Sequence, residues 1–137
     1  MTTLRRVGTT YIPVSCVSRS VEWFTKYLDA ELKFTDDEKA IIDLAGQSFF
    51  LVKAAENQSA NFRDHQNELR FSITFEVDGR DALERLRQTL LDSKVKVGAI
   101  EDRGHPGVNF VFADPDGNLF DVWSELSPNF NKEEGWI

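Results

Sequence analysis

A tight acidic turn leads directly into an alternating strand at residues 114–123, and this stretch holds the side chains best able to do chemistry. The turn reads Asp-Pro-Asp-Gly-Asn, a composition typical of a sharp reversal of the chain. In the strand that follows, Phe120 and Val122 share one face and are expected to be buried, so Asp121 points to the opposite face. A lone carboxylate there could ligate a metal ion, or it could be a solvated strand residue. This choice decides between an enzyme and a binding protein.

A second carboxylate, Glu76, lies on another predicted strand and could share a face with Asp121. Two neighbouring carboxylates can share a proton or bind a cation, whereas two acids on an open sheet face are simply solvated. The chain has two histidines. We expect His65 to be exposed in a polar stretch. His105 lies in a loop between a glycine and a proline, where it could reach the mouth of a site or remain an exposed loop residue.

Several function classes find no support in the sequence. It contains neither a Gly-x-Ser-x-Gly nucleophile motif nor a glycine-rich phosphate loop, so no catalytic residue and no cofactor are predicted. The single cysteine, Cys16, allows no intramolecular disulfide and is expected to be a small buried side chain. A net charge of −7 opposes binding to nucleic acid. No apolar run suits a membrane span and no signal peptide is recognisable, so we expect a cytoplasmic protein without a membrane partner.

The elements that must position these residues begin with a predicted strand at residues 11–14. A helix follows, because the apolar residues Val21, Phe24, Tyr27, Leu28 and Leu32 recur at steps of three and four. We expect Ser18 or Ser20 to cap its N-terminus. Residues 32–34 are expected to be extended. Two further strands, 40–44 and 48–52, are predicted to form a hairpin around Ala45-Gly46.

The same order of elements returns in the second half. The alternation from Leu69 to Val77 predicts one half-buried strand, and Leu83 to Leu91 predict an amphipathic helix. Three strands should follow, at 95–100, 108–113 and 119–123. We therefore predict a single domain with a first module at about 7–53, a linker at 54–68, a second module at about 69–125 and a tail at 126–137.

These residues resemble a known family. The stretch Phe112-Ala113-Asp114-Pro115-Asp116-Gly117-Asn118-Leu119-Phe120-Asp121 is similar to the closing motif of the vicinal oxygen chelate superfamily, which includes glyoxalases, bleomycin resistance proteins and extradiol dioxygenases. Phe75-Glu76-Val77-Asp78 looks like the start of that family's second module, and Ser20 with Trp23-Phe24 looks like its first helix. The resemblance implies an α+β fold of two βαβββ modules whose curled mixed sheets surround a cavity. It also implies a homodimer.

Metal-dependent members of this family place His or Glu ligands on the first and last strands of each module. By resemblance, these positions fall at Asp121, Ser72, Thr9 and Phe50. If the register of the first-module strands slips by one residue, Thr10 and Leu51 take two of these places. Hydroxyl groups are weak ligands for zinc, nickel or iron, and a phenyl ring is none. The sequence therefore predicts no metal site.

The family register turns Phe50 toward the cavity, where Tyr11 and Trp123 would also lie. Aromatic walls with a few polar groups are typical of a pocket for a small planar or cationic molecule. The predicted ligand-binding residues are Thr9, Tyr11, Phe50, Ser72, Thr74, Glu76, His105, Asp121 and Trp123. The sequence thus favours a metal-free protein that sequesters a small molecule in a dimeric cleft. The alternatives are a lyase, isomerase or dioxygenase-like enzyme with a non-standard metal site, or a protein that acts only through protein contacts.

Overall fold

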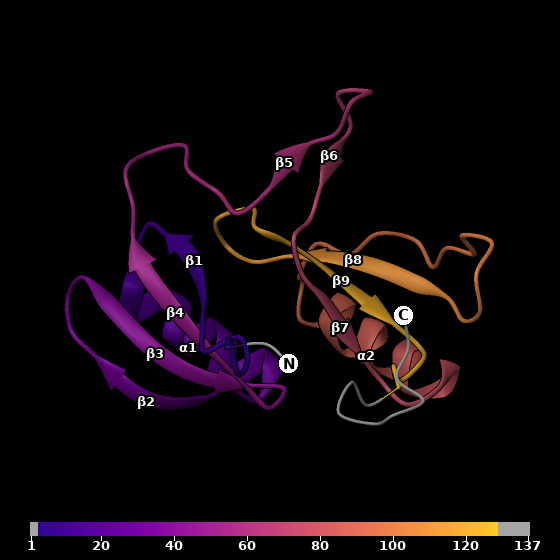
Figure 1. The fold of residues 1–137 in the computed structure, drawn as a ribbon, viewed down its shortest axis with the longest axis horizontal. Helices are drawn as coiled ribbons and strands as arrows, with labels where there is room; N and C mark the ends of the chain where they lie inside the picture. Colours follow the sequence, from indigo (N-terminus) through magenta and orange to yellow (C-terminus); the bar gives the residue numbers. More distant parts are fainter. Residues whose placement is uncertain (1–2, 129–137) are drawn as a thin grey trace. The chain divides into compact units, whose positions relative to one another are not determined.

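The computed structural model of the protein describes residues 3–128. The chain divides into two compact units, each of which combines one helix with a sheet (Figure 1). Of the described residues, the first unit comprises residues 3–70 together with Asp114–Asn118, and the second comprises Phe71–Ala113 with residues 119–128. The turn singled out by the sequence therefore belongs to the first unit, although both strands beside it belong to the second.

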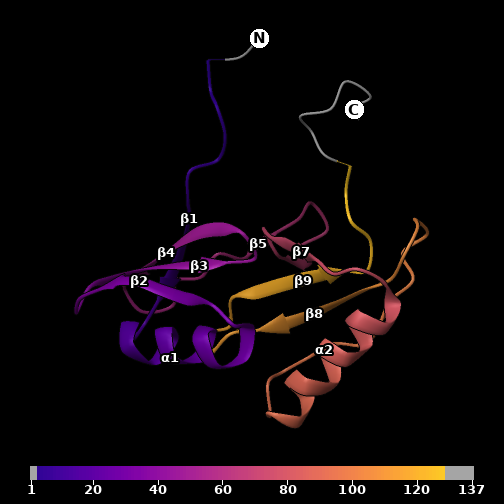
Figure 2. The ribbon, with the colours of Figure 1, turned by 90° about the horizontal axis from the view of Figure 1, so that it is seen from below.

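The first unit contains a four-stranded sheet with one helix along its face (Figure 2). Its elements are β1 (Thr10–Val14), α1 (Val17–Leu28), β2 (Glu31–Thr35), β3 (Lys39–Leu44) and β4 (Gln47–Lys53). The strands lie in the order β1-β4-β3-β2, with β1 parallel to β4 and the other pairs antiparallel. The buried residues Ile12, Ile42 and Leu51 come from three of these strands.

Helix α1 forms because its apolar residues gather on one side, where Val17 and Phe24 are buried. Its N-cap is Cys16, whose extended backbone starts the helix without a capping bond from its own side chain. The expectation that Ser18 or Ser20 caps the helix is wrong, because both lie inside it. The helix ends at Leu28 rather than Leu32, since Asp29 adopts a left-handed conformation with φ of 58°.

The hairpin of β3 and β4 confirms the sequence prediction. Ala45 and Gly46 both have positive φ, 53° and 75°, as the two-residue turn of a twisted hairpin requires. This register pairs Ile41 with Phe50 and Ile42 with Phe49. Ile42 and Phe49 are buried, whereas Phe50 lies on the opposite face of the sheet.

A small two-stranded hairpin, β5 (Phe62–Arg63) and β6 (Leu69–Arg70), completes the first unit. Strand β5 thus lies within the predicted linker at 54–68. The prediction of one continuous strand from Leu69 to Val77 is also wrong, because β6 pairs with β5 whereas β7 (Thr74–Glu76) pairs with β9 in the other unit. Alternation of apolar residues shows that a segment is extended but does not identify its partner.

The second unit repeats the arrangement of the first. It contains β7, α2 (Arg80–Asp92), β8 (Asn109–Ala113) and β9 (Leu119–Trp123), in the sheet order β7-β9-β8. Strand β7 is parallel to β9, as β1 is to β4. The predicted strand at 95–100 is reduced to one isolated bridge, Val97 with Phe112, and a second bridge, Glu101 with Asn109, lies just after it. The α+β class and the repeated order of elements are as predicted.

One face of the second sheet is apolar and lies along α2 (Figure 2). Phe110 and Phe112 of β8 pair with Val122 and Phe120 of β9, and all four are buried, as is Leu83 of the helix. Residues 109, 111, 121 and 123 alternate with these and lie on the opposite face. None of the described helices is long and apolar enough to cross a membrane.

Candidate functional site

The face of the second sheet that lies away from α2 carries a cluster of polar side chains. Strand pairing sets Thr74 of β7 and Val111 of β8 on either side of Asp121 in the central strand. Glu76 and Asn109 flank Trp123 in the same way. The prediction that Asp121 lies opposite the apolar Phe120 and Val122 is therefore confirmed.

Asp121 is almost fully buried, with 1% of its surface exposed. Its Oδ2 accepts hydrogen bonds from Thr74 Oγ1 and Asn109 Nδ2, both at 2.9 Å. Its Oδ1 lies 3.1 Å from Arg103 Nη2. The carboxylate is thus neither a solvated strand residue nor an open ligand, because a guanidinium neutralises its charge and two donors hold its other oxygen.

Arg103 comes from the loop before β8 and also contacts Glu101. Its Nε and Nη2 donate to Glu101 Oε1 at 2.9 and 2.8 Å, and the guanidinium lies 5.6 Å from the centre of the Phe71 ring. Burial acts to lower the pKa of Arg103, but the bond to Glu101 and the charge of Asp121 outweigh it, so the pKa is raised. Arg103 is therefore a permanent cation in this cluster.

The same loop folds back onto the end of β9. Trp123 Nε1 donates to the Pro106 carbonyl at 2.8 Å, and the His105 ring meets the Trp123 ring edge-on with a centroid separation of 5.7 Å. Gly107 permits this close approach, because a Cβ at this position would lie 2.6 Å from Glu125 Cγ and 2.9 Å from Trp123 Nε1. The loop thus brings His105 and Arg103 beside the strand that carries Asp121.

Glu76 has a different set of contacts from Asp121. Its carboxylate accepts hydrogen bonds from the backbone N–H and the hydroxyl of Ser127, so it holds the segment that follows β9. Ser72 is exposed, two residues before Thr74. Of the predicted site residues, the second unit brings together Thr74, Asp121, His105 and Trp123, and it holds Glu76 through Ser127.

The three remaining predicted residues lie in the first unit. Tyr11 of β1 stacks on Phe50 of β4 with ring centres 5.0 Å apart and planes 15° apart, and Thr9 Oγ1 lies 2.9 Å from Ser48 Oγ. Phe50 also lines a pocket of about 370 Å³ whose other walls are Glu38, Lys39, Val52 and Lys53. The first unit therefore offers an aromatic surface beside charged side chains.

Sequence reasoning missed Arg103, Asn109 and Glu101. A signal for Asn109 was present, because it is the one polar residue of the strand Asn-Phe-Val-Phe-Ala and lies in register with the polar face. No periodic pattern marks Arg103, which reaches Asp121 from an irregular loop.

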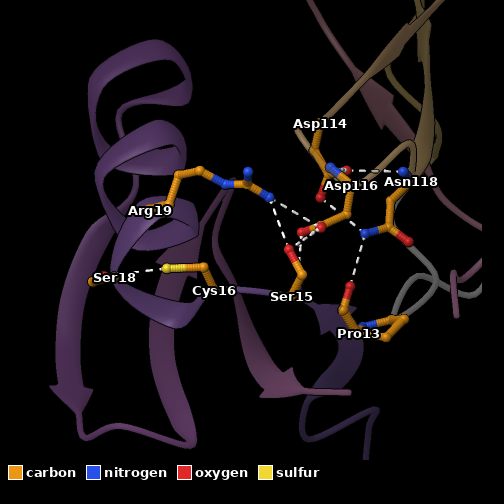
Figure 3. A network of polar contacts seen from close by, with 8 residues as sticks. All are labelled: Pro13, Ser15, Cys16, Ser18, Arg19, Asp114, Asp116 and Asn118. Atoms are coloured by element: carbon orange, nitrogen blue, oxygen red, sulfur yellow. Dashed lines mark hydrogen bonds and ion pairs between the residues drawn. The ribbon is translucent and has the colours of Figure 1, made fainter. Parts of the chain in front are cut away.

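The Asp-Pro-Asp-Gly-Asn turn has structural partners in the first unit (Figure 3). Asp116 accepts hydrogen bonds from the backbone and hydroxyl of Ser15, at 3.2 and 2.6 Å, and pairs with Arg19 at 3.1 Å. Asn118 Nδ2 donates to the Pro13 carbonyl and to Asp114 Oδ2, both at 2.9 Å. The polar side chains of the motif thus hold the turn against the start of α1.

Cys16 lies beside this turn (Figure 3) and is exposed, so the expectation that it is buried is wrong. The reason is its N-cap position, which turns its side chain away from the apolar face of α1. A hydrogen bond with Ser18 lowers the pKa of Cys16.

The residues around Asp121 do not fit a transition-metal site. Nowhere in residues 3–128 do three His, Cys, Asp or Glu side chains gather in a way that could hold a metal ion. The neighbours of Asp121 are instead a hydroxyl, an amide and a guanidinium. The positive charge of the guanidinium repels a metal ion, and the neutral hydroxyl and amide groups bind such an ion only weakly.

The sequence profile of the Glyoxalase/Bleomycin resistance protein/Dioxygenase superfamily matches residues 6–122, and the chain belongs to this family. Its fold is similar to that of the fosfomycin resistance protein FosX from Listeria monocytogenes, with 14% identity, 90% of this chain and 96% of that chain covered, and a TM-score of 0.74. It is also similar to lactoylglutathione lyase from Agrobacterium tumefaciens, with 12% identity, coverage of 89% and 95%, and a TM-score of 0.69.

A FosX variant solved with Mn(II) and 1S,2S-dihydroxypropylphosphonic acid is also similar, with 13% identity, coverage of 90% and 93%, and a TM-score of 0.73. These likenesses concern the fold. A search of curated protein sequences finds no match.

Proposed function

We propose that this protein binds a small organic molecule without a metal ion and without covalent chemistry. The binding surface in the second unit is the polar face around Asp121, with Trp123 and His105 at its side. Thr9, Tyr11 and Phe50 are proposed as ligand contacts on the first unit, and Ser72, Thr74 and Glu76 as further contacts on the second. The ligand we expect is planar or cationic, because stacking on aromatic rings and nearby carboxylates favour such molecules.

One observation carries this proposal. Asp121, which stands at a metal-ligand position by family resemblance, already has its charge neutralised by Arg103. Oδ2 of Asp121 accepts two hydrogen bonds, whereas Oδ1 accepts none among the described residues and is paired only with the charge of Arg103, at 3.1 Å. A divalent ion would have to displace a permanent cation from between Asp121 and Glu101, and it would find two carboxylates there but no imidazole and no third acidic ligand. Metal-independent binding is therefore the function that this geometry favours.

The proposal includes a cytoplasmic homodimer. The support for the homodimer is family membership, since the resemblance to this family implies a dimer in which residues of both subunits often shape each pocket. Sedimentation at several protein concentrations tests this part, and a monomer at all of them would contradict it.

The test of metal independence is elemental analysis of protein purified without chelator. We expect less than stoichiometric manganese, zinc, nickel and iron, and no heat of binding when these ions are titrated into the protein. A tightly held stoichiometric metal would overturn the proposal. A thermal-shift screen of planar cations, with benzamidine compared against benzoate, then tests ligand binding. Turnover of a bound compound that is lost in Asp121→Asn would favour the enzyme instead.

A further inference from the structure

We propose that Arg103 is the built-in cation of this site: its guanidinium lies beside Asp121, the residue that by family resemblance stands at a metal-ligand position. This inference rests on the metal-independent function proposed above. It adds that the position still requires a positive charge, and that a small external cation can fill it when the arginine side chain is removed.

The burial of Asp121 creates the need for a cation. Only 2% of its side chain is exposed, so water cannot solvate the charge. In the part of the chain that the structure describes, Arg103 is the only polar partner of Oδ1. A buried carboxylate that loses its single counter-ion is strongly destabilising, because its charge is then uncompensated.

Arginine suits this place better than lysine. Its Nη2 lies within contact of both Glu101 Oε1, at 2.8 Å, and Asp121 Oδ1, at 3.1 Å, while Nε makes a second bond to Glu101. The ring of Phe71 lies 5.6 Å from the guanidinium carbon. An ammonium group could also contact both carboxylates, but only the planar guanidinium adds the second bond to Glu101 from Nε and the contact with the Phe71 ring.

One nitrogen of the Arg103 guanidinium, Nη1, remains available to a ligand. This nitrogen makes no hydrogen bond with the residues that the structure describes, and 27% of the side chain is exposed. The cluster of Arg103, Glu101 and Asp121 carries one positive and two negative charges, so an anion is disfavoured there. The ligand group that fits Nη1 is a neutral oxygen acceptor, such as a carbonyl.

Asn109 supplies a second unused group nearby. Its Nδ2 is bound to Asp121 Oδ2, while its buried Oδ1 has no hydrogen-bond donor among the described residues. When Arg103 is shortened, Asp121 Oδ1 and Glu101 Oε1 both lose their cation, and carboxylate oxygens are the acceptors that a guanidinium ion requires.

Chemical rescue tests the inference. The variants are Arg103→Ala and the double variant Arg103→Ala with Asp121→Asn, and the control is Arg85→Ala, an exposed arginine on α2. Thermal unfolding is measured with methylguanidinium chloride at low millimolar concentration and with the same concentration of sodium chloride. We expect methylguanidinium, but not sodium chloride, to restore more than half of the decrease in unfolding midpoint temperature that Arg103→Ala causes. This recovery should saturate as the methylguanidinium concentration rises. Wild type, control and double variant should not respond.

The inference is overturned if Arg103→Ala gains nothing, or if the double variant gains as much. Should Arg103→Ala be unfolded at room temperature, its refolding yield with methylguanidinium replaces the midpoint, with the same expected order among variants. Binding of manganese by wild type would overturn the proposed function, whereas absent rescue in Arg103→Ala would overturn only the role of Arg103.

Discussion

At the scale of single residues, the buried carboxylate of Asp114 has a structural role, because it holds the backbone of the turn that follows it. It is 5% exposed, and its Oδ1 accepts the backbone N–H groups of Asp116 and Asn118 at 3.0 and 2.8 Å. Burial raises the pKa of Asp114 above its ordinary value, although the hydrogen bonds from Asn118 and Asp116 act in the opposite direction. The folded protein therefore holds this proton more tightly than the unfolded chain does.

The sign of the pH effect follows from this difference. Because the folded pKa is raised, Asp114 contributes stability below its ordinary pKa of 3.8, and this contribution is lost as pH rises through the folded value. Asp114→Asn cannot titrate. We expect the free energy of unfolding of wild type, relative to Asp114→Asn, to fall as pH rises from acid toward neutral. Urea denaturation at a series of pH values measures it.

Asp37→Asn removes the same charge from an exposed turn and corrects for the change in net charge. If the advantage of wild type over Asp114→Asn grew with pH instead, the raised pKa would be contradicted.

The sequence predicted the position of Asp121 but not its chemistry. Alternation with Phe120 and Val122 was enough to assign its face, since side chains in a strand point to alternate sides. Its partner Arg103 could not be predicted, because a loop residue has no period and reaches its target through tertiary folding. The same limit applies to Glu76, whose bond partner Ser127 lies far along the chain.

At the scale of elements, the loop at residues 102–107 depends on two glycines with different surroundings. Gly104 and Gly107 both have positive φ, 87° and 79°. A Cβ at Gly104 would have no neighbour within 4 Å, whereas one at Gly107 would lie 2.7 Å from Ser124 Oγ. Position 104 therefore favours glycine only because of its left-handed backbone conformation. Position 107 also requires glycine because there is no room for a Cβ atom.

Alanine at each position separates these two effects. Gly104→Ala should cost about 1 kcal/mol in the free energy of unfolding, the penalty of a left-handed residue. Gly107→Ala should cost about 1–3 kcal/mol more, because the added methyl group overpacks the contact with Ser124 and Trp123. Urea denaturation measures both, and the indole N–H resonance of Trp123 should shift only in Gly107→Ala. Equal costs would argue against the tight contact.

The elements with a local signal were predictable. Helix α1 and the hairpin at Ala45-Gly46 follow from spacing and turn residues that lie close together in the sequence. The break between β6 and β7 was not predictable. Residues 69–77 alternate without interruption, although β6 pairs with β5 and β7 pairs with β9. Residues 95–100 were likewise predicted as a full strand although only Val97 forms a bridge there, since apolar spacing does not report hydrogen bonds.

At the scale of the whole molecule, the first unit is completed by a segment from far along the chain. Asn118 is fully buried, and its Oδ1 accepts the backbone N–H of Ala60 at 2.8 Å while its Nδ2 bonds Pro13 and Asp114. Asn61 Nδ2 donates to the Gly117 carbonyl at 2.8 Å. Sequence alone identified this turn as a family motif, but its partners 58 and 105 residues away follow only from the fold.

Asn118→Ala should therefore weaken the first unit. Loss of three hydrogen bonds at about 1 kcal/mol each lowers the free energy of unfolding by about 2–4 kcal/mol. Amide hydrogen exchange should accelerate most at Ala60, whose N–H loses its acceptor. Gln58→Ala, in the exposed stretch before Ala60, is the control and should change neither quantity. Unchanged exchange at Ala60 in Asn118→Ala would contradict this account.

Because residues 114–118 belong to the first unit, that unit cannot be completed during translation until they have been synthesised. Arg70 is synthesised well before Asn118, and at the usual speed of translation the interval is roughly 2–10 seconds. Throughout that interval the Pro13 carbonyl, Ser15, Arg19 and the Ala60 amide lack their native contacts with the turn, although Arg19 Nη2 can still donate to Ser15 Oγ. The N-terminal half of the nascent chain thus waits for the C-terminal half before it can finish folding.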